Sequence, residues 1–255
     1  MNDLFSLEGR TALVTGGSRG IGRMIAAGFL QAGARAVYIS ARKAEACDRT
    51  AAELGALGAC VSLPADISST EGIHALVEAF GQRESALDIL VNNAGAAWGE
   101  TFDTFPEKGW DKVVDLNLKT PFFLTQALSG ALRKAAATRP AKVINIASID
   151  GISVNPQETY SYAASKAGLI QLTRRMALRL VKDNIVVSAI APGAFASDMN
   201  RDARDHAEQV RRRIPAGRIG VDDDMAGAAI YLASRAGDYV VGSTLVVDGG
   251  ATQAR

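Results

Sequence analysis

Short apolar runs rich in β-branched residues alternate along the chain with longer segments in which apolar residues recur at helical spacing. Apolar runs bounded by turn residues are typical of buried parallel strands. The pattern predicts strands at 11–15, 36–40, 60–65, 87–91, 142–147, 185–191 and 243–248. Helices are predicted up to about residues 32 and 57, at about 69–83, 107–136 and 221–233, and from Tyr162 onward.

This alternation predicts an α/β fold with a Rossmann-type, doubly wound parallel sheet in three α/β/α layers. No linker, repeat or low-complexity break interrupts residues 1–255, so we expect a single domain that binds a dinucleotide and carries the catalytic groups. Residues 194–220 are polar and rich in arginine. A segment of this length beside a binding cleft is more often a lid than a disordered tail.

Composition excludes several classes of function. The formal charge is +1, which gives no global field to attract nucleic acid or an anionic membrane. No apolar run reaches membrane-spanning length and the N-terminus does not resemble a signal peptide, so we expect a soluble, cytoplasmic protein. Cys47 and Cys60 form no metal-ligand pattern, and His74 and His206 stand apart from other candidate ligands. Neither a metal site nor a histidine-based triad is expected.

A glycine-rich turn joins the first predicted strand to the first helix. Its sequence is Gly16-Gly-Ser-Arg-Gly-Ile-Gly22. Glycines allow the backbone to approach a pyrophosphate, and the N-terminus of the following helix attracts its charge. The spacing is G-x-x-x-G-x-G, which differs from the commonest dinucleotide fingerprint, but the strand and helix on either side favour a cofactor site over a bare structural turn.

The end of the second strand bears on the choice of cofactor. It reads Ser40-Ala-Arg-Lys43, where an acidic residue would bind the 2′-hydroxyl of NAD. Arg42, together with Arg19 in the glycine-rich turn, favours the 2′-phosphate of NADP. The alternative is that Arg42 and Lys43 only solvate the start of a helix.

Other polar groups follow the carboxyl ends of predicted strands. Asp66 closes the third strand and Asn92-Asn-Ala-Gly95 follows the fourth. Ligands of doubly wound sheets bind at such ends. A turn-forming role explains Asn-Asn-Ala-Gly equally well in isolation, because asparagine and glycine tolerate turn geometry. Ser148 follows the strand at 142–147 and precedes Tyr162 by fourteen residues.

Tyr162 and Lys166 are four residues apart at the start of a helix and therefore share a face. A free phenol has a pKa of about 10, and a positive charge beside it is expected to lower that pKa, so that Tyr162 can exchange a proton near neutral pH. Tyr160 lies about 240° from Lys166 around the helix and cannot share this site. The alternative is an ordinary amphipathic helix start with a snorkelling lysine.

The long helix at 107–136 carries Asn117 and, four residues later, Pro121. Proline has no N–H and its ring crowds the carbonyl of residue i−4, so the Asn117 carbonyl is predicted to lose its helical partner and the helix to bend there. A freed carbonyl invites a water. A kink made only for packing is the alternative.

Together these motifs resemble the short-chain dehydrogenase/reductase family across nearly the whole chain. The motifs are Thr15-Gly-Gly-Ser-Arg-Gly-Ile-Gly22, Asp66, Asn92-Asn-Ala-Gly95, Asn117, Ser148, Tyr162-x-x-x-Lys166, Pro192-Gly193 and Asp248-Gly-Gly250. Within the family the chain is most similar to NADPH-dependent 3-oxoacyl reductases of the rhamnolipid-synthesis type, with gluconate 5-dehydrogenase-like enzymes as near neighbours.

The resemblance implies catalytic roles. Tyr162 would be the general acid in carbonyl reduction, Lys166 would lower its pKa and bind the nicotinamide ribose, Ser148 would hold the substrate oxygen, and Asn117 would keep a water on a proton relay to Lys166. The implied residues for NADP(H) are Gly16, Ser18, Arg19, Gly20, Ile21, Arg42, Asp66, Ile67, Asn93, Ala94, Gly95, Tyr162, Lys166, Pro192, Gly193 and Ser197. Proton donation and hydrogen bonds can stabilise the developing alkoxide, so no metal is expected.

The reaction we infer is NADPH-dependent reduction of a carbonyl, with 3-oxoacyl thioesters as the preferred substrate class. An NADP-dependent alcohol or polyol dehydrogenase and a non-catalytic NADPH-binding protein are the alternatives. The residues expected to border the cleft are Ala96, Ala97, Trp98, Ile149, Asp150, Ile152, Ala194 and Phe195, and their mostly apolar character suits an acyl chain. The interval from Ser148 to Tyr162 is one residue longer than is usual in the family, which leaves the width of the cleft open.

Two kinds of partner follow from these expectations. The resemblance implies a homotetramer or homodimer through the long helices. An acyl carrier protein or a coenzyme A thioester is anionic and could be steered by basic groups. The candidate groups are Arg211, Arg212, Arg213, Arg174, Arg175, Arg179 and Lys182. The alternative is that these are solvated helix faces, balanced by the acids Asp202, Asp205, Glu208 and Asp222 to Asp224.

Overall fold

The computed structural model describes residues 3–197 and 200–254. Within them a parallel sheet of seven strands has the order β3-β2-β1-β4-β5-β6-β7. The strands are β1 (Thr11–Thr15), β2 (Ala36–Ser40), β3 (Cys60–Ser62), β4 (Ile89–Asn92), β5 (Ala141–Ile146), β6 (Ile185–Pro192) and β7 (Thr244–Val247). The order reverses direction between β1 and β4, which confirms the predicted doubly wound sheet.

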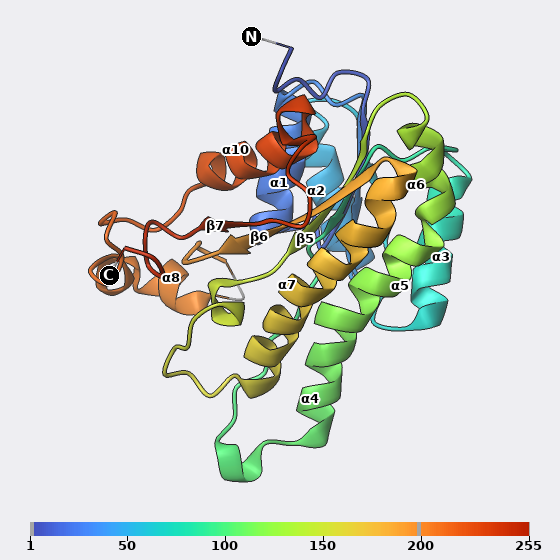
Figure 1. The fold of residues 1–255 in the computed structure, drawn as a ribbon. Helices are drawn as coiled ribbons and strands as arrows, with labels where there is room; N and C mark the ends of the chain where they lie inside the picture. Colours follow the sequence, from blue (N-terminus) through green and yellow to red (C-terminus); the bar gives the residue numbers. More distant parts are fainter. Residues whose placement is uncertain (1–2, 198–199, 255) are drawn as a thin grey trace.

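Helices cover both faces of the sheet (Figure 1). One face carries α1 (Gly20–Gln31), α2 (Ala44–Leu54) and α10 (Asp222–Ala233). The other carries α3 (Thr70–Gly81), α5 (Thr120–Ala127), α6 (Ser129–Ala136) and α7 (Tyr160–Leu180), while α4 (Glu107–Val114) extends this layer beyond the sheet. The segment after β6 contains α8 (Arg201–Asp205) and α9 (Ala207–Arg211).

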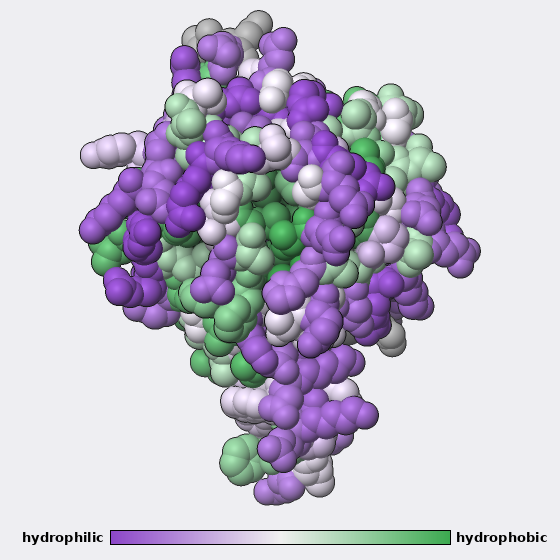
Figure 2. Space-filling model, turned by 90° about the vertical axis from the view of Figure 1, so that its right-hand side faces the viewer, coloured by the Kyte–Doolittle hydropathy of each residue, from purple (hydrophilic) through white to green (hydrophobic). Residues whose placement is uncertain are grey.

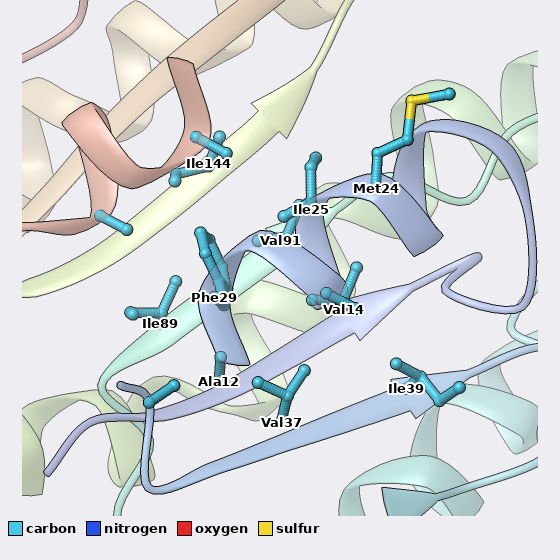
Figure 3. Close-up of a cluster of buried hydrophobic side chains, with 14 of the residues drawn as sticks. Ala12, Val14, Met24, Ile25, Phe29, Val37, Ile39, Ile89, Val91 and Ile144 are labelled. Atoms are coloured by element: carbon cyan, nitrogen blue, oxygen red, sulfur yellow. The ribbon is translucent and has the colours of Figure 1, made fainter. Parts of the chain in front are cut away.

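Alternate strand residues face opposite helical layers. Val14 of β1 joins the core beneath α1, whereas the preceding Leu13 joins the core beneath α3 and α5. Figure 3 shows Phe29 and Ile25 of α1 lying over the strand residues of the first core. Phe29 is fully buried, and burial of such a side chain stabilises the fold by about 1.5–3 kcal/mol. Strands covered on both faces explain why the sequence shows continuous apolar runs.

The third strand is shorter than the sequence pattern predicted, because it ends at Ser62 instead of residue 65. Leu63 and Ala65 still donate backbone hydrogen bonds to Ile39 and Ala41. Pro64 lies between them at the edge of the sheet, where the position of its missing N–H faces away from β2.

The predicted helix at 107–136 is three helices. A π turn at Asp115–Lys119 separates α4 from α5, with Thr120 N–H donating to the Asp115 carbonyl, and a second break at Leu128 precedes α6. The π turn includes Asn117, the position at which the sequence predicted a disturbance of the helix, and the three helices follow one another along one side of the molecule (Figure 1). The wider turn accommodates the missing N–H of Pro121, which lies in the first turn of α5.

The two ends of the segment predicted as a lid, residues 194–220, lie side by side. Gly220 N–H donates to Ala194 O at 2.9 Å, and Phe195 pairs with Gly220 in a parallel bridge. A Cβ on Gly220 would overlap the Phe195 ring, so glycine allows this close approach. Figure 1 shows α8 beyond the carboxyl end of β6. Within the described ranges, no helix combines the length and apolar character needed to cross a membrane.

Candidate active site

The predicted site residues come together at the carboxyl ends of the central strands. The glycine-rich turn follows β1, Asn93 to Gly95 follow β4, Ser148 follows β5, and Gly193 follows β6. Because these strands are parallel neighbours in the sheet, their ends meet along one edge. Residues that are far apart in the sequence therefore form one continuous site.

The glycine-rich turn has no room for side chains at two positions. Gly16 has a φ of +65°, and a Cβ there would lie 2.7 Å from Asn93 Nδ2. A Cβ on Gly22 would overlap the Gly16 carbonyl oxygen. Arg19 stands at the N-cap of α1 and has no acceptor to offer the N–H groups of the first turn. Those donors and the helix dipole are suited to an anion.

Thr15 and Asn93 lock this turn to the end of β4. The Thr15 hydroxyl donates to Val91 O at 3.2 Å and accepts from the backbone N–H groups of Asn93 and Ala94, each at 3.0 Å. Asn93 Nδ2 donates to Thr15 O at 2.8 Å and to Gly16 O at 3.2 Å. Asn93 thus shapes the loop. Thr15 was not among the predicted site residues, because its partners lie far along the chain.

The ends of β2 and β3 carry the charged groups of the predicted cofactor site. The pKa of Asp66 is lowered mainly by a hydrogen bond from the Ser68 hydroxyl, at 2.7 Å, and to a smaller extent by the positive charge of Arg42. Arg42 is exposed. Ile67, predicted to contact the cofactor, has its side chain buried in the core and its carbonyl bound to the Thr120 hydroxyl.

Gly20 and Ser197, two of the remaining predicted cofactor residues, are close neighbours in the lining of one pocket. A Cβ on Gly20 would lie 3.3 Å from Ser197 Cβ, and the Ser197 hydroxyl accepts the Asn200 N–H at 3.1 Å. The pocket is lined by Arg19, Gly20, Arg23, Met24, Ala196, Ser197, Arg204 and Asp222. Ser18 and Ile21 are half-buried in the same turn. Gly193 N–H donates to Val247 O at 2.9 Å, which ties the Pro192-Gly193 turn to β7.

Ser148 and Tyr162 lie side by side. Ser148 is 7% exposed, and its hydroxyl accepts the Asp150 N–H at 3.1 Å. Burial raises the pKa of Tyr162 to about 12, the hydrogen bond with Ser148 acts in the opposite direction, and the charge of Asp150 adds to the increase. The phenol is therefore neutral at physiological pH.

Lys166 does not have the predicted effect on Tyr162 in this structure. Its ammonium lies 5.6 Å from the centroid of the Tyr162 ring and donates to Ile146 O at 2.7 Å. Burial lowers the pKa of Lys166 to about 8, because removal from water disfavours the charged form. The expectation of a lowered tyrosine pKa is wrong for the protein without cofactor, since the desolvation of the phenol outweighs the more distant positive charge.

Asn117 joins the loop after β4 to α7. Its side chain accepts the Ala96 N–H at 2.8 Å, donates to Ala96 O at 2.9 Å and donates to the Ser165 hydroxyl at 3.1 Å. Ser165 in turn donates to Tyr162 O at 2.8 Å. The side chain of Asn117 is thus committed to holding the site together. Its carbonyl lies in the π turn, four residues before Pro121.

Three aromatic side chains lie near the site. Trp98 and Phe195 were expected to border the cleft, and Tyr160 was expected to lie outside it. The Trp98 ring packs against Gly109, where a Cβ would come within 2.8 Å of it, and Phe195 is 2% exposed beneath Gly220. Phe195 is thus buried, whereas Trp98 is half-buried with the Lys112 ammonium over its ring. Tyr160 donates to Glu158 at 2.9 Å, and its ring meets Phe102 and Phe105 edge to face, away from Lys166 as predicted.

Comparison with known proteins gives the same picture along the whole chain. A family model described as enoyl-(acyl carrier protein) reductase matches residues 16–252. The chain is 49% identical to the rhamnolipids biosynthesis 3-oxoacyl-[acyl-carrier-protein] reductase of Pseudomonas aeruginosa, covering 98% of this chain and 99% of that protein. It is 42% identical to the 2-dehydro-3-deoxy-D-gluconate 5-dehydrogenase of Escherichia coli, covering 96% of each.

A solved structure shares the fold closely. The Pseudomonas aeruginosa RhlG/NADP active-site complex has a TM-score of 0.94 to this structure at 49% identity, covering 98% of this chain and 99% of that one. The sheet order, the glycine-rich turn after β1 and the Tyr162-Lys166 pair beside Ser148 agree with these matches. The chain belongs to the short-chain dehydrogenase/reductase family of oxidoreductases.

Proposed function

We propose that this protein reduces the 3-keto group of 3-oxoacyl thioesters with NADPH, and that Tyr162 supplies the proton. The observation that carries the proposal is a neutral phenol, hydrogen-bonded to Ser148 and close to a buried lysine, at the edge of the sheet that also holds the glycine-rich turn. The Pseudomonas aeruginosa relative named as a 3-oxoacyl-[acyl-carrier-protein] reductase supports the substrate class.

The glycine-rich turn fits a dinucleotide. At Gly16 and Gly22 an added Cβ would meet the loop backbone or Asn93, so the chain here is shaped for close backbone approach. The N-terminus of α1, which has no side-chain cap, suits a pyrophosphate, and Arg19 and Arg42 suit the 2′-phosphate of NADP. The solved relative in complex with NADP supports this choice. When bound, NADPH supplies a hydride to the carbonyl carbon.

The side chains of this chain supply the rest of the reaction. Ser148 holds the substrate oxygen, and Tyr162 donates its proton to that oxygen as negative charge develops there. The product is an alcohol and the tyrosine becomes a phenolate, which must regain a proton before the next turnover. A raised tyrosine pKa keeps the acid form in place at neutral pH and so favours reduction over the reverse reaction. A water on the Asn117 carbonyl would return a proton through Lys166.

Polyol or alcohol oxidation with NADP is the second candidate. The relative from Escherichia coli, a 2-dehydro-3-deoxy-D-gluconate 5-dehydrogenase, favours it. Asp150 and Asn155 add polar groups beside Ser148, which could accept or donate hydrogen bonds to hydroxyls. A non-catalytic NADPH-binding role is disfavoured, because Asn117, Ser148, Tyr162 and Lys166 are all positioned together.

The surroundings of the site support further parts of the proposal. We infer one catalytic domain in which residues 194–220 act as a lid, hinged where Gly220 meets Phe195. A cytoplasmic homotetramer or homodimer would use the long helices of the face that carries α4 to α7. Figure 2 shows apolar groups surrounded by polar ones on the side that lies at the right of Figure 1. Phe122 and Phe123 of α5 are 38% and 41% exposed and contact each other edge to face.

The predicted docking of an acyl carrier protein or coenzyme A stays a proposal. Arg211 pairs with Glu208 at 2.6 Å and Arg179 pairs with Asp183 at 3.2 Å, so acidic neighbours offset part of the basic cluster. The pairs are exposed and contribute little to stability, which leaves these cations able to exchange partners.

A substrate panel tests the proposed function. Loss of NADPH absorbance is followed with 3-oxoacyl thioesters, keto-gluconates and cyclic ketones, and each is repeated with NADH. We expect the highest kcat/KM with the thioesters and NADPH. Higher kcat/KM for a keto-gluconate would replace the proposal with its second candidate, and absence of turnover with every compound would contradict both.

A further inference from the structure

Asp150 lies on the same short turn as the catalytic hydroxyl. Ser148 begins a 3-10 turn at Ile149–Gly151, and its hydroxyl accepts the N–H of Asp150. The turn packs against α7, and a Cβ on Gly151 would lie 2.6 Å from the backbone carbon of Lys166. The backbone of Asp150 is thereby fixed beside Ser148 and the start of α7, and Asp150 does not belong to the proton-transfer groups. Its charge raises the pKa of Tyr162, which is consistent with this closeness.

The carboxylate has a neutral partner. Asn155 Nδ2 donates to Asp150 Oδ1 at 2.7 Å, and Asn155 Oδ1 accepts the Gln157 N–H at 2.7 Å, so the asparagine is fixed between the two. Within residues 3–197 and 200–254, Asp150 makes no ion pair with a lysine or arginine. The residue is half-buried. Its negative charge is thus neither neutralised by a cation nor fully screened by water.

We propose that Asp150 is a specificity-determining residue that excludes a free carboxylate next to the reacting carbonyl. A 3-oxoacyl ester or thioester places an uncharged acyl group two carbons from the ketone, whereas a free 3-oxo acid places an anion there. The inference rests on the proposed function and narrows it, because it predicts that esters and thioesters are reduced in preference to free 3-oxo acids. Specificity of this kind comes from repulsion of the wrong substrate.

The expected size of the effect follows from the interaction of two like charges. Several ångströms apart, at the effective dielectric constant found near protein surfaces, such a pair changes a binding or rate constant by roughly ten- to hundredfold. This exceeds the change expected from adding one methyl group to a site, which is about four- to fivefold for a fully buried group. A free acid and its methyl ester, which differ by one charge and one methyl group, can therefore reveal the effect of charge repulsion.

The test compares acetoacetate with methyl acetoacetate, using NADPH and the full-length protein. In the wild type we expect kcat/KM for the ester to exceed that for the acid by at least about tenfold. Asp150→Asn should reduce this ratio by roughly tenfold, whereas Asp150→Glu, which keeps the charge, and Asn155→Ala, which removes only the neutral partner, should retain most of it. Glu78→Gln on the exposed face of α3 controls for net charge.

The outcomes separate the two proposals. Equal use of acid and ester by the wild type would overturn the role of Asp150 and leave the proposed function standing. An unchanged ratio in Asp150→Asn would do the same, as would an Asn155→Ala ratio that falls as far as that of Asp150→Asn. If Asp150→Asn does not fold, Asp150→Ser is the second uncharged variant, and a ratio as high as that of the wild type in this variant would overturn the proposal. Failure to reduce any 3-oxo compound would overturn the proposed function itself.

Discussion

The glycine-rich turn and the catalytic turn lie at neighbouring strand ends, but they are held in different ways. In the first, backbone atoms come so close that Gly16 and Gly22 leave no space for a Cβ. In the second, Gly151 makes one such close approach to α7, and the rest of the turn is held by hydrogen bonds that involve the side chains of Ser148, Asp150 and Asn155. Residues after the catalytic turn include Val154, which is 100% exposed.

The difference has a functional meaning. A turn formed by close backbone contacts tolerates little change, which suits a cofactor that is the same for every substrate. A turn held by side-chain hydrogen bonds can change partners when one residue is replaced, which suits the choice of substrate. Variants of the glycine-rich turn should therefore lose cofactor affinity, whereas variants of the catalytic turn should change turnover or substrate preference.

The largest effect is expected at the proton donor. Tyr162→Phe keeps the ring but removes the acid, so kcat should fall by roughly 10² to 10⁴, as is typical of general acid catalysis, while the Kd for NADPH stays within a few-fold. Tyr160→Phe is the matched control, because that phenol binds Glu158 outside the site. Near-normal turnover by Tyr162→Phe would show that another group donates the proton.

Gly22→Ala should weaken cofactor binding, whereas Tyr162→Phe should mainly reduce kcat. The added methyl group must displace the Gly16 carbonyl or Asn93 Nδ2, and overpacking of this kind costs about 1–3 kcal/mol. NADPH affinity, measured by fluorescence titration, should fall by roughly tenfold or more. Gly227→Ala is the control, since a Cβ on that helical glycine meets no atom within 4 Å in the described structure. A Gly22→Ala protein with normal NADPH affinity would contradict the tight fit.

Lys166 is predicted to reduce stability at neutral pH. Its pKa falls to about 8 in the folded protein from its ordinary value of 10.5, so the unfolded chain binds more protons between these pH values and stability should rise with pH there. Lys166→Met removes this dependence. The difference in unfolding free energy between Lys166→Met and the wild type should shrink from pH 7 to pH 10, measured by urea unfolding. Lys182→Met on the surface is the control, and a pH-independent difference would disprove the buried-charge explanation.

The arginines of the cofactor side should give smaller effects. Arg19→Ala and Arg42→Ala each remove a charge-assisted contact to a phosphate that NADH lacks, so each should weaken NADPH by roughly tenfold and NADH much less. Lys43→Ala tests the alternative that the basic pair only solvates the start of α2. Equal losses for both cofactors would show that these arginines do not recognise the 2′-phosphate.

Prediction from sequence worked best where a local pattern determines the structure. The apolar runs and the glycine-rich turn depend on neighbouring residues, and the Tyr162-Lys166 spacing depends on helix geometry alone. The end of β3 and the π turn were missed because the effect of Pro64 and Pro121 depends on what the backbone can pair with nearby. The role of Thr15 was missed because its hydrogen-bond partners come from another strand.

The electrostatics of the site could not be read from spacing. The four-residue spacing of Tyr162 and Lys166 predicted a favourable charge beside the phenol, but the direction of each pKa shift depends on how deeply the folded chain buries the two groups. Burial raises the pKa of Tyr162 and lowers that of Lys166. The nearby Asp150 adds to the first effect, and its closeness depends on the turn after Ser148.

The protonation state of Tyr162 is the central claim, and direct titration tests it. Ultraviolet absorbance of phenolate is recorded from pH 7 to pH 10 for the cofactor-free wild type and for Tyr162→Phe, so that the other four of the five tyrosines cancel in the difference. With a Tyr162 pKa near 12, the two proteins should show the same phenolate content up to pH 10. An additional phenolate in the wild type near pH 7 to 8 would contradict the account.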